Sequence, residues 1–225
     1  MSKKKLITVI PVYNEADTIK KTIDGLKNIE LIDEILIVDD GSTDNTPEII
    51  QQLGVPTIRI HSNCGKGYAM KLAIENAKYD YIAFIDGDLG FTSQQLTKLI
   101  KPVVSEEVDF TIAKFGVPKT RGGFGLVKGL ARMGVFAFTG KRMHTSLSGQ
   151  RVYRREVVES IKYMPNNYGI EVAMTIQAIG NGYSFKEIPV DMEHRYSDRS
   201  LAGFRHRGRQ FIDIMGTLAY MGLRR

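Results

Sequence analysis

The stretch YIAFIDGDLG, residues 81–90, decides how the rest of the chain is interpreted. Five apolar residues end abruptly in two carboxylates, Asp86 and Asp88, that flank a glycine. An apolar run of this length, bounded by turn residues, is typical of a strand buried on both faces of a sheet. The carboxylates would then lie at the carboxyl end of that strand, where open α/β sheets bind ligands. Two anionic oxygen ligands suit a divalent cation that carries phosphates, although an acidic turn alone is a weak signal.

Strand and helix patterns alternate from the amino terminus to this stretch. Apolar runs at residues 6–10, 34–38 and 57–60 predict three earlier strands, the first of them stopped by Pro11. Segments with helical spacing follow each run, as at Ile19, Ile23 and Leu26. The alternation predicts an α/β fold with a mainly parallel central sheet and helices on both faces.

Each of these four strands ends in a polar or glycine-rich loop. In chain order the loops carry Asn14-Glu15, Asp39-Asp40, Gly65-Lys66-Gly67 and Asp86-Gly87-Asp88. Strand ends are polar in most proteins, so one such loop would mean little. Parallel connectivity places all four at one edge of the sheet, where we expect them to converge on one ligand.

The second half of the chain is less regular. Its patterns predict a helix from Thr92, strands near 108–113 and 185–190, a short helix after 151–155, a helix from Glu171 and a basic amphipathic helix from Arg205. Residues 121–138 are apolar with interspersed cations and five glycines. This segment leaves two interpretations open, a helix that leans on the core and a helix that lies at a membrane interface.

Length and composition favour one globular unit. A chain of 225 residues can bury one sizeable core, so we expect a single catalytic domain over residues 1–225. Cys64 is the only cysteine, which excludes an intramolecular disulfide. The basic start is not followed by an apolar stretch long enough for a signal peptide, and no run suits a spanning helix. These features predict a cytoplasmic protein.

The net charge of +6 hides an asymmetry along the chain. Residues 1–113 carry 12 basic and 17 acidic side chains, whereas residues 114–155 carry 10 basic and none that is acidic. Such a segment predicts an anionic partner, for which phosphate, an anionic membrane surface and nucleic acid are candidates. Nucleic acid fits the acidic first half poorly, and the chain has no recognition helix or aromatic stacking motif, so we expect no nucleic-acid partner.

Several common site motifs are absent from the sequence. It contains no GxxxxGK[ST] phosphate loop and no GxGxxG dinucleotide fingerprint. It has no Gly-x-Ser-x-Gly elbow, and its four histidines do not form a zinc pattern. The carboxylates and the strand-end loops therefore remain the best site candidates.

Taken together, four motifs resemble those of the family 2 glycosyltransferases, and as a set they are highly specific. They are residues 11–15 (PVYNE), 38–44 (VDDGSTD), 65–67 (GKG) and 86–88 (DGD). Residues 148–155 and 169–171 further resemble the acceptor region of dolichyl- and polyprenyl-phosphate sugar synthases. The resemblance implies a glycosyltransferase A, Rossmann-like fold and a transferase that uses a nucleotide-sugar donor. It divides the chain into a donor-binding half, 1–113, and an acceptor-binding half, 114–225.

The resemblance also assigns residues to the donor. The nucleotide-binding residues that it implies are Pro11, Tyr13, Glu15, Asp39, Asp40, Gly65, Lys66 and Asp86. Among them, Asp39 and Asp40 would hold the base and ribose. Asp86 and Asp88 would form the metal motif for Mg²⁺ or Mn²⁺, with Asp88 the direct ligand. A cation there neutralises the charge that grows on the departing diphosphate.

One position departs from the family pattern. Those synthases often place a polar ligand two residues after the second aspartate, where this chain has Gly90. Water or His194 would then complete the metal shell. The alternative for His194 is a solvated loop histidine.

The acceptor stays open at this point. A hydroxyl acceptor needs a general base, the role in which Glu171 would be catalytic, whereas an ionised phosphate needs none. Glu171 could also simply favour the dipole of a helix that it begins. By resemblance, Arg151 would contact an acceptor phosphate, and Arg195 or Arg199 the leaving diphosphate, since arginine suits bidentate anion contacts.

The hypothesis from the sequence is a metal-dependent, inverting sugar transfer to a phosphorylated, lipid-linked acceptor, by a protein peripheral to the inner face of the membrane. The alternatives are a soluble hydroxyl acceptor, such as a phosphorylated glycerate or a glycan, and a non-catalytic nucleotide-sugar-binding protein.

Overall fold

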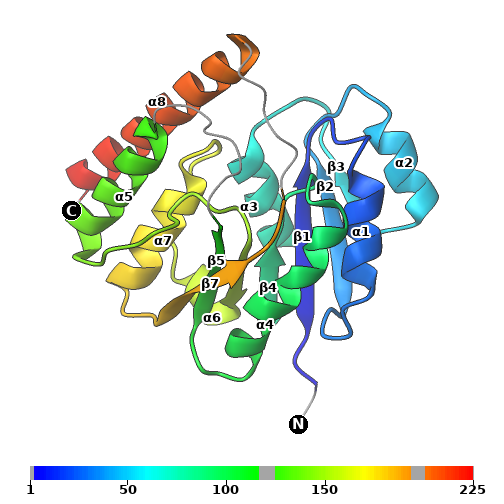
Figure 1. Ribbon diagram of the computed structural model, residues 1–225, viewed down its shortest axis with the longest axis horizontal. Helices are drawn as coiled ribbons and strands as arrows, with labels where there is room; N and C mark the ends of the chain where they lie inside the picture. The colour runs from blue at the N-terminus through cyan, green and yellow to red at the C-terminus, as the bar shows by residue number, and fades with distance from the viewer. Residues whose placement is uncertain (1–2, 117–124, 194–200, 225) are drawn as a thin grey trace.

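The computed structural model describes residues 3–116, 125–193 and 201–224, with side chains omitted for 201–207. Its centre is a seven-stranded sheet in the order β3-β2-β1-β4-β6-β5-β7 (Figure 1). The strands are β1 Leu6–Val12, β2 Glu34–Asp39, β3 Thr57–Arg59, β4 Tyr81–Phe84, β5 Phe110–Phe115, β6 Arg151–Arg154 and β7 Phe185–Val190. All neighbouring pairs are parallel except those of β6, which runs antiparallel to β4 and to β5. The predicted α/β fold with a mainly parallel sheet is confirmed.

Helices cover both faces of this sheet. They are α1 Ile19–Lys27, α2 Thr46–Leu53, α3 Lys66–Asn76, α4 Leu96–Val104, α5 Leu126–Thr139, α6 Arg155–Glu159, α7 Ile170–Gly180 and α8 Leu201–Leu223, with a 3₁₀ turn, η1, over Gly90–Gln95. Alternate residues of β1 point into two separate apolar clusters, Ile7 and Val9 on one face, Leu6 and Ile10 on the other. The first cluster is closed by α3 and α7, and the second by α1 and α4.

The strand β1 runs two residues further than its proline predicts. Pro11 pairs with Val38 of β2 and is followed by Val12, so the proline does not stop the strand. On the other side of β1, pairing with β4 ends at Val9. Pro11 therefore lies beyond the stretch that is paired on both sides, where a missing backbone donor is tolerated.

The strand β6 is an element that the sequence pattern did not predict. Residues 151–154 were expected only to lead into a helix, but they insert between β4 and β5. Only four residues long and with an arginine at each end, the segment has no strand signature of its own. The gap in the sheet, rather than the local sequence, makes it a strand.

A second layer of helices lies outside α7. Figure 1 shows α8 running alongside α5, and both helices contact α7. Two glycines allow the close approach of α8: the Cβ that alanine would add at Gly134 of α5 would meet Leu218 Cδ1 at 2.6 Å, and at Gly169 it would collide with Thr217. The expected basic helix of the tail is confirmed as α8, and residues 126–139 form a helix whose inner face packs on the core. None of the described helices is both long and apolar enough to cross a membrane.

Candidate active site

Loops from the carboxyl ends of β1 and β2 are joined to each other by hydrogen bonds. The Asn14 amide donates to Ser42 Oγ at 3.0 Å, and the Thr43 amide donates to Asn14 Oδ1 at 2.8 Å. The Glu15 amide donates to Thr46 Oγ1 at 2.8 Å, at the start of α2. Asn14 adopts a left-handed φ of 58°, which asparagine tolerates better than most residues. The two predicted nucleotide loops are thus one connected unit.

Asp40 holds the third loop against this unit. Its two carboxylate oxygens accept hydrogen bonds from the amides of Cys64 and Gly65, each at 2.8 Å. Burial raises the pKa of the Asp40 carboxyl, and the two amides offset only part of that rise. Because both oxygens are engaged by the backbone, Asp40 positions the loop that begins α3.

Asp39 offers an acceptor at the same edge. Its Oδ1 accepts from the Ser42 amide at 2.9 Å. Its Oδ2 is buried and has no hydrogen-bond donor in the described part of the chain, although Arg59 Nε lies 3.5 Å away. A buried acceptor without a donor is costly unless a ligand supplies one.

The centre of the site is an ion-paired cluster of Lys66, Asp86 and Glu171. Lys66 Nζ lies 2.6 Å from Asp86 Oδ1 and 2.9 Å from Glu171 Oε1, so one ammonium bridges two carboxylates. The side chains of Lys66 and Asp86 are 21% and 25% exposed, whereas that of Glu171 is 6% exposed. The cluster is therefore open to a ligand from the Lys66–Asp86 side.

This arrangement fixes the charge of the lysine. Burial by itself lowers the pKa of the Lys66 amine, but Asp86 and Glu171 outweigh it and raise that pKa above its ordinary value. Lys66 was expected only among the nucleotide-binding residues. Its position between the two carboxylates links the start of α3 to the loop after β4 and to α7, which the sequence did not indicate.

Two residues that sequence reasoning missed hold the Asp86–Asp88 loop. Thr22 of α1 donates from Oγ1 to the carbonyl of Gly87 at 2.8 Å and accepts from the Gly90 amide at 2.9 Å. Gln150 donates from Nε2 to Asp86 Oδ2 at 2.6 Å. Gln150 stands within the acceptor-like motif at 148–155, which was the only available signal for it; Thr22 had none.

Gly149 lines the same cluster. A Cβ added there would lie 2.6 Å from Asp86 Oδ1 and would also collide with Lys66 Nζ. A larger residue at this position, just before β6, would therefore force the side chains of Lys66 and Asp86 to shift.

Arg151 has a structural role, which corrects the expectation that it contacts the acceptor phosphate. Its side chain has no exposed surface. The guanidinium donates to the carbonyls of Ser146, Ser148 and Glu171, and to the hydroxyls of Tyr153 and Thr175. With these internal acceptors, Arg151 ties β6 to the first turn of α7 and so fixes the backbone of Glu171.

Other predicted site residues fall in different places. Tyr13 is exposed beside the β1 loop, and Pro11 and Glu15 are partly buried in it. His194, Arg195 and Arg199 lie outside the described residues.

A divalent cation fits the donor set at the end of β4. Within the described ranges, no group of three or more His, Cys, Asp or Glu side chains is arranged to hold a metal. The two carboxylates of Asp86 and Asp88 suit Mg²⁺, which is commonly held by one or two carboxylates, water and substrate phosphates rather than by a full protein cage. Asp86 already binds the ammonium of Lys66, so this position accepts a cation.

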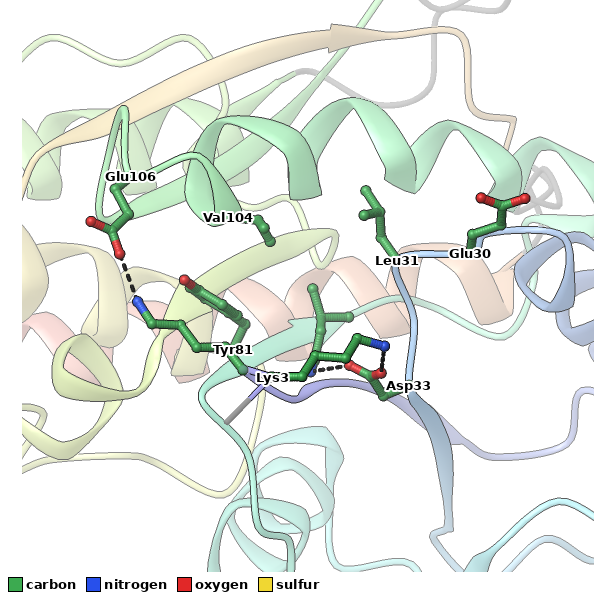
Figure 2. Close-up of a pocket in the computed structure, with 9 residues that line it drawn as sticks. Lys3, Glu30, Leu31, Asp33, Tyr81, Val104 and Glu106 are labelled. Atoms are coloured by element: carbon green, nitrogen blue, oxygen red, sulfur yellow. Dashed lines mark hydrogen bonds and ion pairs between the residues drawn. The ribbon is translucent and has the colours of Figure 1, made fainter. Parts of the chain in front are cut away.

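An opening of about 390 Å³ lies at the opposite end of the sheet (Figure 2). It is lined at the start of β1 by Leu6 and at the start of β4 by Tyr81. Four of its charged side chains pair with one another, Lys3 with Asp33 and Lys4 with Glu106, each at 2.6 Å. Since ligands of α/β sheets bind at the carboxyl ends of the strands, this opening is not the site.

The family model for glycosyl transferase family 2 matches residues 8–162, which include every loop described above. The chain belongs to this family. Its sheet also carries the glycosyltransferase A fold: a glucosyl-3-phosphoglycerate synthase from Mycobacterium tuberculosis, crystallised with Mn²⁺, uridine diphosphate and phosphoglyceric acid, superimposes with a TM-score of 0.81 at 22% identity. That match covers 96% of this chain and 77% of the other.

Two curated relatives are similar over most of this transferase. Glycosyltransferase AglJ of Haloferax volcanii is 29% identical over 215 residues, which cover 91% of this chain and 69% of the relative. Polyprenol monophosphomannose synthase of Mycolicibacterium smegmatis is 26% identical over 243 residues, covering 98% of this chain and 88% of the relative.

Proposed function

We propose that this glycosyltransferase moves a sugar, with inversion, from a nucleoside-diphosphate sugar to a phosphorylated, lipid-linked acceptor, using Mg²⁺ or Mn²⁺. The observation that carries the proposal is the Lys66 bridge between Asp86 and Glu171 at the edge where the strand-end loops meet. Family relatives point in the same direction, because one of them is a polyprenol monophosphomannose synthase.

The donor would bind across the loops of residues 1–113. Asp39 Oδ2 is an acceptor without a donor in the described part of the chain and would receive an N–H of the base. The diphosphate would then lie along the Gly65–Lys66 turn, with Asp86 and Asp88 holding the cation. When bound, the cation supplies Lewis-acid neutralisation of the departing diphosphate. Lys66 adds a positive charge beside the same group.

Residues 114–225 would form the acceptor side. A phosphate acceptor attacks in its ionised form and needs no general base. Glu171 Oε1 is already engaged by Lys66 at 2.9 Å, so in this arrangement the carboxylate positions the lysine instead of facing an acceptor hydroxyl. This favours a phosphate acceptor, and Arg195 and Arg199 remain proposed contacts to the leaving diphosphate, as does His194 to the metal.

A soluble hydroxyl acceptor is the second candidate. It is favoured by the burial of Glu171 inside the site, where it could take a proton if Lys66 turned to the donor. The similar solved structure holds phosphoglyceric acid, an acceptor-sized molecule with a hydroxyl group.

The first experiment is a donor panel with Mn²⁺ or Mg²⁺. Release of nucleoside diphosphate is measured with polyprenyl phosphate, with phosphoglycerate and without acceptor. Release that depends on both the metal and polyprenyl phosphate is the expected result. Preferential release with a soluble acceptor would overturn the lipid-linked proposal.

Glu171→Gln then separates the two chemistries, because it removes the carboxylate charge with little change of shape. With a phosphate acceptor we expect turnover to fall by less than about tenfold, since no base is lost. With a hydroxyl acceptor the loss of a general base lowers turnover by about 10²- to 10⁴-fold.

A further inference from the structure

The outer face of α5 and α8 concentrates the exposed apolar side chains of the protein. In the described ranges nine large hydrophobic residues are exposed, and six of them lie on these two helices. They are Leu126, Met133 and Phe136 of α5, and Ile212, Met215 and Leu223 of α8. Three of these side chains, Leu126, Met133 and Ile212, are each 67% exposed. Scattered single exposures are ordinary, but a set gathered on two neighbouring helices is not.

Helical spacing places these residues on one stripe of each helix. On α8, positions 212, 215, 219 and 223 fall on the same side, and the small residue Ala219 in this series is exposed as well. The opposite sides of the two helices pack against the core: Ala131 and Val135 of α5 and Ile214 of α8 are buried in the core cluster. The helices run side by side (Figure 1), so the two stripes belong to one outer layer.

The charges that accompany the stripes have one sign. Lys128 and Arg132 are exposed on α5, Lys141 and Arg142 just after it, and Arg209 and Arg224 on α8. No acidic residue occurs in α5, and the one acid of α8 among its described side chains, Asp213, has Oδ2 buried. Apolar side chains bordered by cations match an anionic lipid surface, which attracts the cations and receives the apolar groups between its headgroups.

This face also borders the acceptor side of the active site. Thr217 of α8 packs against Gly169, two residues before Glu171. Burial raises the pKa of the Tyr168 phenol, and the charges that act on it include Lys66 and Glu171 of the site together with Arg209 of α8. The first described side chains of α8 are therefore within electrostatic reach of the residues that surround the ion-paired cluster.

We infer that the outer face of α5 and α8 docks on an anionic bilayer and so brings the site to lipid-linked phosphate. The inference deepens the proposed function and rests on it only for the identity of the acceptor, because docking itself needs no catalysis. Half-buried helices with cationic borders lie in the plane of the interface rather than crossing it.

The chain contains no tryptophan, so a single introduced tryptophan reports its own surroundings. Met133→Trp and Ile212→Trp place reporters on the two stripes, and Leu31→Trp is the matched control, an exposed apolar residue on the far end of the sheet. With vesicles of phosphatidylcholine and phosphatidylglycerol, we expect a blue shift and quenching by brominated lipid at 133 and 212 but not at 31. Equal behaviour at all three positions would overturn the inference.

A pair of charge reversals tests the exposed cations that accompany the apolar stripes. Lys128→Glu/Lys141→Glu should lower the partition coefficient for anionic vesicles by at least about tenfold. The difference between the variant and the unsubstituted protein should become smaller at high salt, which screens the charges. Lys27→Glu/Lys101→Glu makes the same change of net charge at exposed positions of α1 and α4 and should leave partitioning within about twofold. Equal losses in both pairs would mean that net charge alone drives binding, which contradicts a defined docking face.

Two further readouts separate the alternatives. A blue shift without lipid that grows with protein concentration, together with a doubled mass in solution, would assign the face to a second copy of the chain and overturn lipid docking. Metal-dependent binding of a nucleoside diphosphate is measured without vesicles: if it is intact while vesicle binding fails, only the docking face is wrong. If vesicles bind and the nucleotide does not, only the proposed function is wrong.

Discussion

The two sides of the active site are held together in different ways. The proposed donor side consists of short loops that are tied to one another by hydrogen bonds, such as the two that Asp40 accepts from backbone amides. The proposed acceptor side depends on packing between segments far apart in the chain, through the buried guanidinium of Arg151 and the contact of α8 with Gly169. Only the ammonium of Lys66 bonds directly to carboxylates on both sides among the contacts described above. Local motifs therefore encode the donor side, whereas the acceptor side is assembled by the fold.

The largest expected effect is on the donor side, at Asp88. Asp88→Asn removes a proposed metal ligand, and we expect turnover to fall by about 10²- to 10³-fold, with weaker Mn²⁺ binding in electron paramagnetic resonance titrations. Asp24→Asn, at a partly exposed position of α1 that pairs with Lys20, is the control and should bind Mn²⁺ normally. Unchanged Mn²⁺ binding by the Asp88 variant would remove this residue from the metal site.

Lys66→Met tests the bridge between the two sides. The variant leaves Asp86 and Glu171 facing each other without a counterion, so we expect turnover to fall about 10²-fold and stability by about 2–3 kcal/mol. Mn²⁺ should bind more tightly in the absence of nucleotide, because the competing ammonium is gone. Lys71→Met on the same helix, where the exposed amine contacts Asn166, is the control. Weaker Mn²⁺ binding by the Lys66 variant would contradict the competition.

Gly149→Ala tests how closely the segment before β6 approaches the Lys66–Asp86 pair. The added Cβ would crowd Asp86 Oδ1 at 2.6 Å, so we expect the Lys66–Asp86 pair to shift and turnover to drop by about tenfold. At Gly180, the last residue of α7, an added Cβ meets no atom within 4 Å, which makes Gly180→Ala the matched control. The difference is measured by metal-dependent turnover at equal folded fraction. Normal kinetics in both variants would show that the β6 segment leaves room at the carboxylate.

The smallest expected effect lies away from the site, at Asp109. Its carboxylate bonds Arg154 at 3.1 Å and the amide and hydroxyl of Ser184 at 2.8 and 2.7 Å. Burial alone would raise the pKa of Asp109, but Ser184 and Arg154 outweigh it and lower that pKa. The resulting stability is present above the unfolded-state pKa of about 3.9 and is lost as the pH falls through the lowered folded-state pKa.

Asp109→Asn should therefore lower the free energy of unfolding by about 1–2 kcal/mol at pH 7. The difference in this free energy between the variant and the unsubstituted protein should become smaller below about pH 4. Urea unfolding at several pH values measures it. Since the residue joins β5 to β6 and β7, turnover of the folded variant should be unchanged. A difference that does not vary with pH would mean that the Asp109 charge contributes nothing to stability.

The features that could be predicted from the sequence are those encoded by local motifs, and the features that could not are those assembled by the fold. The loops after β1, β2 and β4 were predictable because each motif directly follows an apolar strand, and parallel strands bring their carboxyl ends together. The strand β6 was not, because its four residues become a strand only in the space between β4 and β5. Arg151 was assigned to a ligand because arginine commonly binds phosphate, but here five internal acceptors surround its guanidinium.

The distance along the chain between interacting residues separates what the sequence determines from what the tertiary structure decides. The amino-acid sequence by itself determined the parallel α/β sheet, the edge that carries the candidate site and the two carboxylates after β4, since these depend on short-range periodicity and on residues adjacent in the chain. Only the tertiary structure decided that Lys66 bridges Asp86 and Glu171, that Thr22 and Gln150 hold the Asp86 loop, and that α5 and α8 share an outer apolar face. Those features depend on which distant segments pack together, because a buried charge or hydrogen-bonding group takes the partner that the fold brings to it.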